Sequence, residues 1–131
     1  VLLPALGVLW GGPFGSDSLP PRLAPASDGS DELETLRLLA GLLKRTVQLF
    51  IPETGTQSDD RVATMTRLAD DVAYLHGLRR VIPPAVAAGS DWAQIEDAAW
   101  PALPAAWRTN QGRPVHEENV RVLVEAVKRN A

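Results

Sequence analysis

Glycine and proline crowd the beginning of this 131-residue chain, with five of each in its first thirty positions. This density forbids a continuous α-helix there, because proline lacks an amide donor and glycine costs a helix interior about 1 kcal/mol relative to alanine. The segment is nevertheless apolar, with Val1, Leu2, Leu3, Leu6, Val8, Leu9, Trp10 and Phe14. We therefore predict that residues 1–30 form an extended arm that packs on its own domain or on a neighbouring subunit.

From Asp31 onward the spacing of apolar residues becomes helical. Asp31 and Glu34 stand three positions apart, as in a capping box at a helix N-terminus. Apolar residues then recur at three- and four-residue steps: Leu33, Leu36, Leu39, Ala40, Leu43, Val47 and Phe50. This pattern predicts an amphipathic helix over residues 31–50, ended by Pro52 and Gly55.

A second helix is expected after Ser58, which would cap it. Its apolar stripe consists of Val62, Met65, Leu68, Ala69, Val72 and Leu75. Pro83 and Pro84 are expected to stop this helix at about Ile82, because the residue before a proline avoids the helical conformation. Residues 31–78 are thus interpreted as a helical hairpin that serves dimerisation or supports the fold.

The rest of the chain also predicts helices, at about 84–88, 90–99, 103–109 and 115–129. No run of four to eight residues alternates apolar and polar side chains as a half-buried strand does. The sequence therefore predicts an all-α fold, with one helical domain over residues 31–131 behind the Gly/Pro-rich arm.

Composition limits the classes of protein to consider. The chain has no cysteine, which excludes thiolate metal sites and disulfide scaffolds and fits a reducing cytoplasm. Its formal charge is −3. Its apolar runs are too short for a transmembrane helix, and no basic segment precedes the first of them as in a signal peptide. Charge is uneven: residues 1–78 hold six basic and ten acidic residues, whereas residues 79–131 hold seven and six.

Catalytic motifs are not found. His116 begins the sequence His-Glu-Glu-Asn, which lacks the second histidine that a zinc-protease helix requires. His76 has no flanking acid that would make it a catalytic base, and the acidic pairs 59–60 and 70–71 lack further magnesium ligands at helical spacing. We therefore expect neither enzymatic activity nor a cofactor nor a bound metal.

One segment has a recognisable pattern. Residues 85–108 contain Ala-Ala-Gly, then Trp-Ala-Gln-Ile from Trp92, then Ala-Ala-Trp-Arg ending at Arg108. This resembles the helix-turn-helix of small regulators of high-GC bacteria. Gly89 would end one helix, Ser90 or Asp91 would cap the next, and small alanines would let a third helix pack closely. Pro101 and Pro104 depart from the usual pattern at the turn and at the start of the third helix.

The resemblance implies a dimeric DNA-binding regulator, with the helix-turn-helix and a closing helix in residues 79–131. Its candidate phosphate contacts are Arg79, Arg80, Arg108 and Arg113, and its candidate base contacts are Thr109, Asn110 and Gln111. The alternative is a non-catalytic interaction module or subunit, favoured by the net acidity, the four tryptophans and the apolar arm. In that case residues 1–30 and the helices of 31–78 would bind a second copy or another protein.

Overall fold

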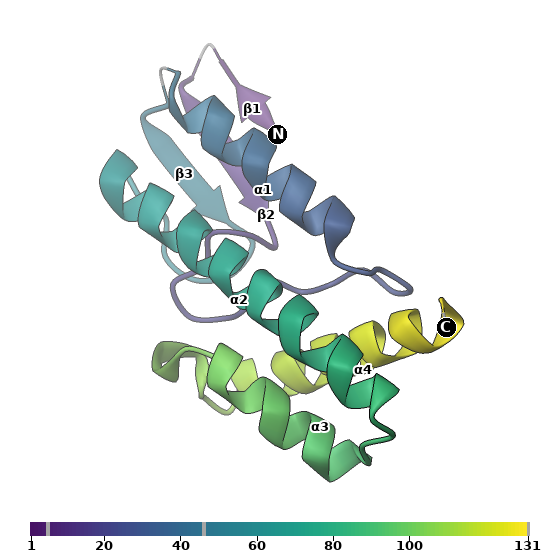
Figure 1. Ribbon diagram of the computed structural model, residues 1–131. Helices are drawn as coiled ribbons and strands as arrows, with labels where there is room; N and C mark the ends of the chain where they lie inside the picture. Colours follow the sequence, from purple (N-terminus) through teal and green to yellow (C-terminus); the bar gives the residue numbers. More distant parts are fainter. Residues whose placement is uncertain (5, 46, 131) are drawn as a thin grey trace.

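The computed structural model describes residues 1–4, 6–45 and 47–130. Within these ranges the chain forms four α-helices and a three-stranded sheet (Figure 1). The strands are β1 (Leu2–Leu3), β2 (Val8–Gly12) and β3 (Leu49–Pro52), in the order β1-β2-β3. β1 is antiparallel to β2, and β3 is parallel to it. The prediction of an all-α fold is therefore wrong, and the protein is α+β.

The strands escaped prediction because each lies in a segment assigned to something else. β2 lies inside the Gly/Pro-rich arm, and β3 lies where the first helix was expected to end. The two pair in register from Val8 with Leu49 to Trp10 with Ile51, across about forty residues of sequence. Such long-range pairing leaves no periodic signal in a segment of five residues or fewer.

The aromatic ring of Phe50 fixes the sheet against the loop that follows β2. A Cβ atom at Gly11 would lie 2.3 Å from Phe50 Cζ, and one at Gly15 would lie 2.5 Å from the same atom. Gly15 also has a φ of 74°, in the left-handed region that favours glycine. The glycines that rule out a helix in the arm thus allow this ring to pack directly on the backbone.

Helix α1 (Ser30–Leu43) is shorter than predicted and is capped differently. Its N-cap is Gly29, whose φ is 88° and which provides no side-chain hydrogen bond, so the expected Asp31–Glu34 capping box is not formed. Glu32 instead accepts hydrogen bonds from the Ala24 amide and the Ser27 hydroxyl. The helix ends seven residues early because the chain must become extended to pair with β2.

Helix α2 (Arg61–Ala87) begins and ends elsewhere than predicted. Asp60 rather than Ser58 caps it, accepting from the amides of residues 62 and 63. The helix continues through Pro83 and Pro84, so the predicted stop at Ile82 and the separate helix at 84–88 are wrong. The last turns are held by packing, because Ile82 is fully buried beneath them, and this offsets the amide donors that proline lacks.

The C-terminal part agrees with the sequence prediction at two helices and differs between them. Helix α3 (Trp92–Ala99) carries a capping box of Asp91 and Gln94, and Gly89 has the predicted left-handed conformation. Two 3₁₀-helices follow, η1 (Trp100–Ala102) and η2 (Ala105–Trp107), in place of the α-helix expected at 103–109. Helix α4 (Gly112–Arg129) corresponds to the predicted closing helix.

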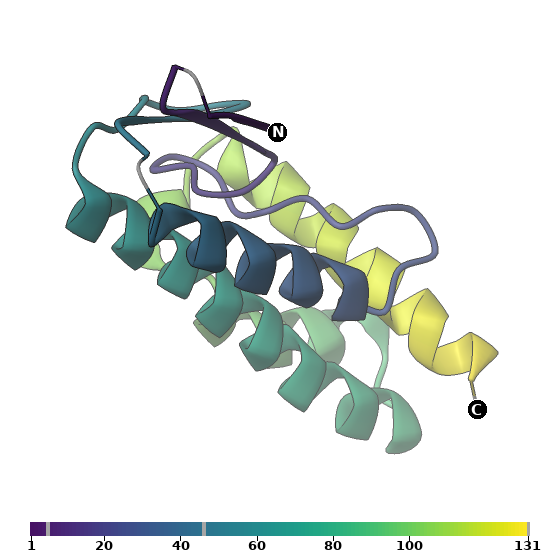
Figure 2. The same cartoon turned by 90° about the horizontal axis from the view of Figure 1, so that it is seen from above.

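Helix α2 is the central element of the fold. It contacts α1, α3 and α4, and its buried side chains include Leu68, Leu75 and Leu78. The arm joins the same core through Leu9 and Phe14. Figure 2 shows the strands along one side of the helical layer rather than between two layers. None of the described helices is both long and apolar enough to span a bilayer.

Candidate protein-binding surface

The sheet presents an apolar surface on the side away from the helices. Because side chains alternate along a strand, Leu9 and Phe50 point into the core, whereas their neighbours point outward. The outward positions, as the strand register aligns them, are Val1, Leu3, Val8, Trp10, Leu49 and Ile51. All six are apolar. We call this set the outer sheet face.

The outer sheet face is open at its β1 side. Trp10 is 47% exposed, Leu3 48% and Val1 72%, and Leu6, in the turn between β1 and β2, is 67% exposed. Single exposed apolar residues are ordinary, but a contiguous group on one face is typical of an interaction site. A parallel strand pair such as β2–β3 is moreover usually covered on both faces.

The free edge of β1 offers much less to a partner than the face does. β1 has only two residues and is followed by Pro4, which has no amide to donate. Hydrogen bonds between residues 1 and 10 hold this strand to β2: the Val1 ammonium donates to the Trp10 carbonyl, and the Trp10 amide donates to the Val1 carbonyl. The geometry therefore favours docking onto the face over extension of the sheet.

The segment that resembles a helix-turn-helix lacks an α-helix at the recognition position. Pro104 precedes η2 and Gly112 opens α4, which leaves residues 108–111 in irregular backbone. Arg108 donates from Nε to the Leu103 carbonyl, and its guanidinium lies 4.8 Å from the centroid of the Trp100 ring. The side chain of Arg108 is thus engaged within the protein.

The other DNA-contact candidates divide into two groups. Arg113 lies 5.6 Å from the Trp100 ring centroid, beside Arg108, and Thr109 accepts a hydrogen bond from the Gly112 amide. Asn110 and Gln111 are exposed in the same loop. The second group, Arg79 and Arg80, is exposed on α2, and among the described residues no hydrogen bond or ion pair joins it to the first.

A buried polar network ties the arm to helices α2 and α4. The Asn119 amide accepts from the Leu23 amide and donates to the Pro21 carbonyl, which fixes its orientation, and it also donates to the Tyr74 hydroxyl. Tyr74 therefore has its own proton free to donate to His116 Nδ1, 2.9 Å away. Burial raises the pKa of Tyr74. Burial, and after it the charge of Arg108, lowers the pKa of His116 to about 4.

Asp71, which the sequence analysis considered only as part of an acidic pair, is fully buried. Its Oδ2 accepts from the Gly15 amide at 2.7 Å, whereas its Oδ1 is buried without a partner. Burial raises the pKa of Asp71 to about 7, although the hydrogen bond from Gly15 opposes this shift. This carboxyl therefore changes charge near neutral pH.

The described side chains around His116 do not form a metal site. His116 lines a hollow of about 390 Å³ together with Glu96, Asp97, Trp100, Arg113 and Glu117. Within the described ranges, however, no three His, Asp or Glu residues are arranged to hold a metal ion. In the neutral form fixed by Tyr74, the ring of His116 keeps its proton on Nε2, which cannot then bind a cation.

Comparisons with known proteins give no identification: no family model, no curated protein and no solved structure matches this chain. Its function must therefore be argued from its own residues.

Sequence reasoning found part of this surface and missed the rest. It identified the apolar residues of the arm and proposed that they meet a partner. It did not find Leu49 and Ile51, because Leu49 was assigned to the helix predicted over residues 31–50 and Ile51 to the break that follows it. Their alternation with the buried residues Phe50 and Pro52 is visible in the sequence only once a strand is known to lie there.

Proposed function

We propose that this protein is a non-catalytic interaction module and that its outer sheet face binds the same face of a second copy. The observation that carries the proposal is the exposure of Trp10 within a face made wholly of apolar side chains. Aromatic residues at the centre of a patch are the type that contributes most to protein–protein binding.

The absence of charged side chains on this face favours a second copy as its partner. Each copy carries a formal charge of −3, and surfaces that bear those charges would repel when two identical copies meet. The six outward positions bear no charged side chain, so two outer sheet faces can pack about 10 Å apart around a two-fold axis. The six outward residues of this face are far fewer than the roughly 20–30 residues per side of a standard interface. We therefore expect a dimer that dissociates on dilution.

Sedimentation velocity across a concentration series tests the proposal. The wild-type protein should shift from monomer to dimer as concentration rises, and Trp10→Lys should remain monomeric because it places a charge in the contact. Val62→Lys is the matched control, since Val62 is 75% exposed on α2 and lies outside the outer sheet face. A wild-type protein that stays monomeric throughout, or a Trp10→Lys variant that dimerises like the wild type, would refute self-association.

Binding of duplex DNA is the second candidate function. It is favoured by the gathering of Arg108 and Arg113 at Trp100, beside Thr109, Asn110 and Gln111. It ranks second because the segment has no recognition helix and Arg108 already bonds to the backbone. Fluorescence anisotropy of labelled duplex in a salt series tests it: binding should weaken linearly in log–log with salt, and Arg108→Ala with Arg113→Ala should flatten the slope.

A further inference from the structure

A long apolar groove runs between helices α1 and α2. Its volume is about 670 Å³, within the range of small-molecule sites. Buried Leu36 and Leu68 contribute to its lining, and the remaining apolar residues along it are Leu33, Ala40, Met65, Ala69, Val72 and Ala73. This groove is distinct from the outer sheet face.

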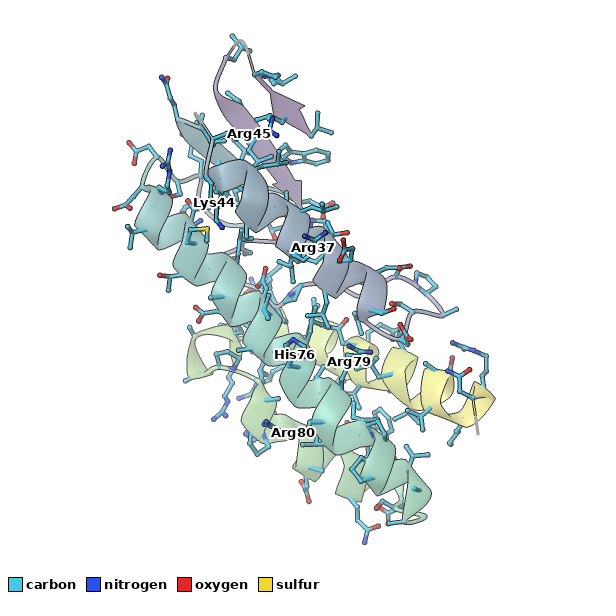
Figure 3. The ribbon with its side chains drawn as sticks, turned by 45° about the horizontal axis from the view of Figure 1, so that its top comes forward. Arg37, Lys44, Arg45, His76, Arg79 and Arg80 are labelled. Carbon is cyan, nitrogen blue, oxygen red and sulfur yellow. The ribbon has the colours of Figure 1, made fainter. Side chains whose placement is uncertain are left out.

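One end of the groove is cationic. His76 and Arg79 line it beside the first residue of α1, as Figure 3 shows. Within the part of the chain that the structure describes, neither side chain takes part in a hydrogen bond or an ion pair. Arg37, farther along, is already paired with Glu34.

Asp28 lies near Arg79, but among the described residues it forms no hydrogen bond or ion pair with it. Asp28 Oδ1 accepts from both the amide and the hydroxyl of Ser30. The pKa of Asp28 is lowered mainly by the hydrogen bond from the Ser30 hydroxyl, and attraction to Arg79 lowers it by a smaller amount. The Arg79 guanidinium therefore keeps its donors available to a ligand.

We propose that the α1–α2 groove binds a free long-chain carboxylate, with its acyl chain along the apolar walls and its head group at Arg79 and His76. The geometry fits in two respects. Met65 and Arg79 are fourteen residues apart on one helix, which at 1.5 Å per residue gives a groove about 21 Å long. Arg79, whose guanidinium forms no hydrogen bond or ion pair among the described residues, stands at one end of the groove, where a single anionic head group belongs.

The neighbouring α2–α4 groove is a poorer site for such a chain. It has a similar volume and shares His76 and Arg79, but Asp28, Arg80 and Asn130 add polar groups to its walls. The two grooves can be separated by filling each with one larger side chain. Ala73 lies in the first and Ala87 in the second, and both are exposed on α2.

Isothermal titration of the full chain with dodecanoate tests the proposal, with dodecyltrimethylammonium as the ligand of equal tail and opposite charge. We expect saturable binding of one dodecanoate, at least tenfold tighter than the cation. Arg79→Gln should raise the dissociation constant at least fivefold, whereas Arg80→Gln, one residue on and outside this groove, should leave it within twofold. Ala73→Phe should abolish binding, and Ala87→Phe should not.

Several results would overturn the assignment. Equal binding of the two ligands, or wild-type affinity in Arg79→Gln, would mean adsorption to apolar surface, and loss of binding in Trp10→Lys would place that adsorption on the outer sheet face. Binding to phosphatidylglycerol vesicles without saturable dodecanoate binding would assign the groove to a membrane surface. If the Ala73→Phe substitution dissociates the dimer, the α1–α2 groove binds a second copy instead of a carboxylate.

Discussion

Replacement of Asp71 by asparagine should change how the stability of this protein depends on pH. Asp71 is fully buried, with Oδ2 on the Gly15 amide and Oδ1 without a partner. Asparagine keeps an oxygen that can accept from Gly15 and carries no charge at any pH. The variant therefore resembles the protonated acid in charge at every pH and removes the ionisation.

The magnitude follows from the shifted pKa. Asp71 titrates at about 7 in the folded protein, against an ordinary value of 3.8. Because the folded state holds this proton more tightly than the unfolded chain does, the stabilisation is fully present below pH 3.8 and is lost as the pH rises through about 7. Between pH 5 and pH 8 the loss amounts to roughly 2.5 kcal/mol of unfolding free energy.

His116 changes the stability in the opposite direction, so the pH dependence of wild-type stability alone would not isolate the effect of Asp71. Its folded pKa of about 4 lies below the ordinary 6.5. The stabilisation that His116 contributes is present above pH 6.5 and is lost as the pH falls through about 4. Both the wild type and Asp71→Asn contain His116, and its contribution cancels in their difference.

Urea denaturation followed by circular dichroism at pH 5 and pH 8 measures that difference. The stability of Asp71→Asn relative to wild type should increase by roughly 2.5 kcal/mol between the two pH values. Asp97→Asn, the same change at an exposed carboxylate of α3, should shift by less than about 0.5 kcal/mol. A difference for Asp71→Asn that does not vary with pH would show that Asp71 is ionised or solvated in the folded state, contrary to the buried geometry.

Three further substitutions test the packing and the polar contacts. Gly11→Ala should lower the unfolding free energy by about 1 to 3 kcal/mol in urea denaturation, because its Cβ would overlap the Phe50 ring; unchanged stability would contradict that close approach. Tyr74→Phe should cost about 1 to 3 kcal/mol, since it leaves buried partners unpaired, and a neutral result would mean that water replaces the hydroxyl. Asp91→Ala should cost about 1 kcal/mol through loss of the α3 cap, and a melting temperature equal to that of wild type would argue against the cap.

Local patterns in the sequence correctly predicted the features that depend on neighbouring residues. The apolar stripe of residues 115–129 is helix α4, and Ser90 or Asp91 was expected to cap the helix that Asp91 does cap. The burial of part of the arm also followed from its composition. The candidate DNA contacts could be chosen by residue type, but their separation into two groups could not, because side-chain position depends on packing.

Local signals failed where distant segments compete for the same residues. The stripe that predicted a helix to Phe50 is continuous, yet the chain leaves the helix at Leu43 because β3 gains hydrogen bonds from β2. The double proline should end α2 at Ile82, yet the burial of that residue carries the helix on to Ala87.

The sequence alone determined the approximate positions of the four described α-helices, though not all of their ends, and that this chain has no thiol chemistry. These properties depend on residues within one or two turns of each other, so they can be predicted from the sequence. The tertiary structure alone decided that residues 8–12 and 49–52 form one sheet, and thereby which apolar side chains are exposed. That choice depends on contacts between segments some forty residues apart, where the free energy of pairing and burial exceeds the local preference of a short strand.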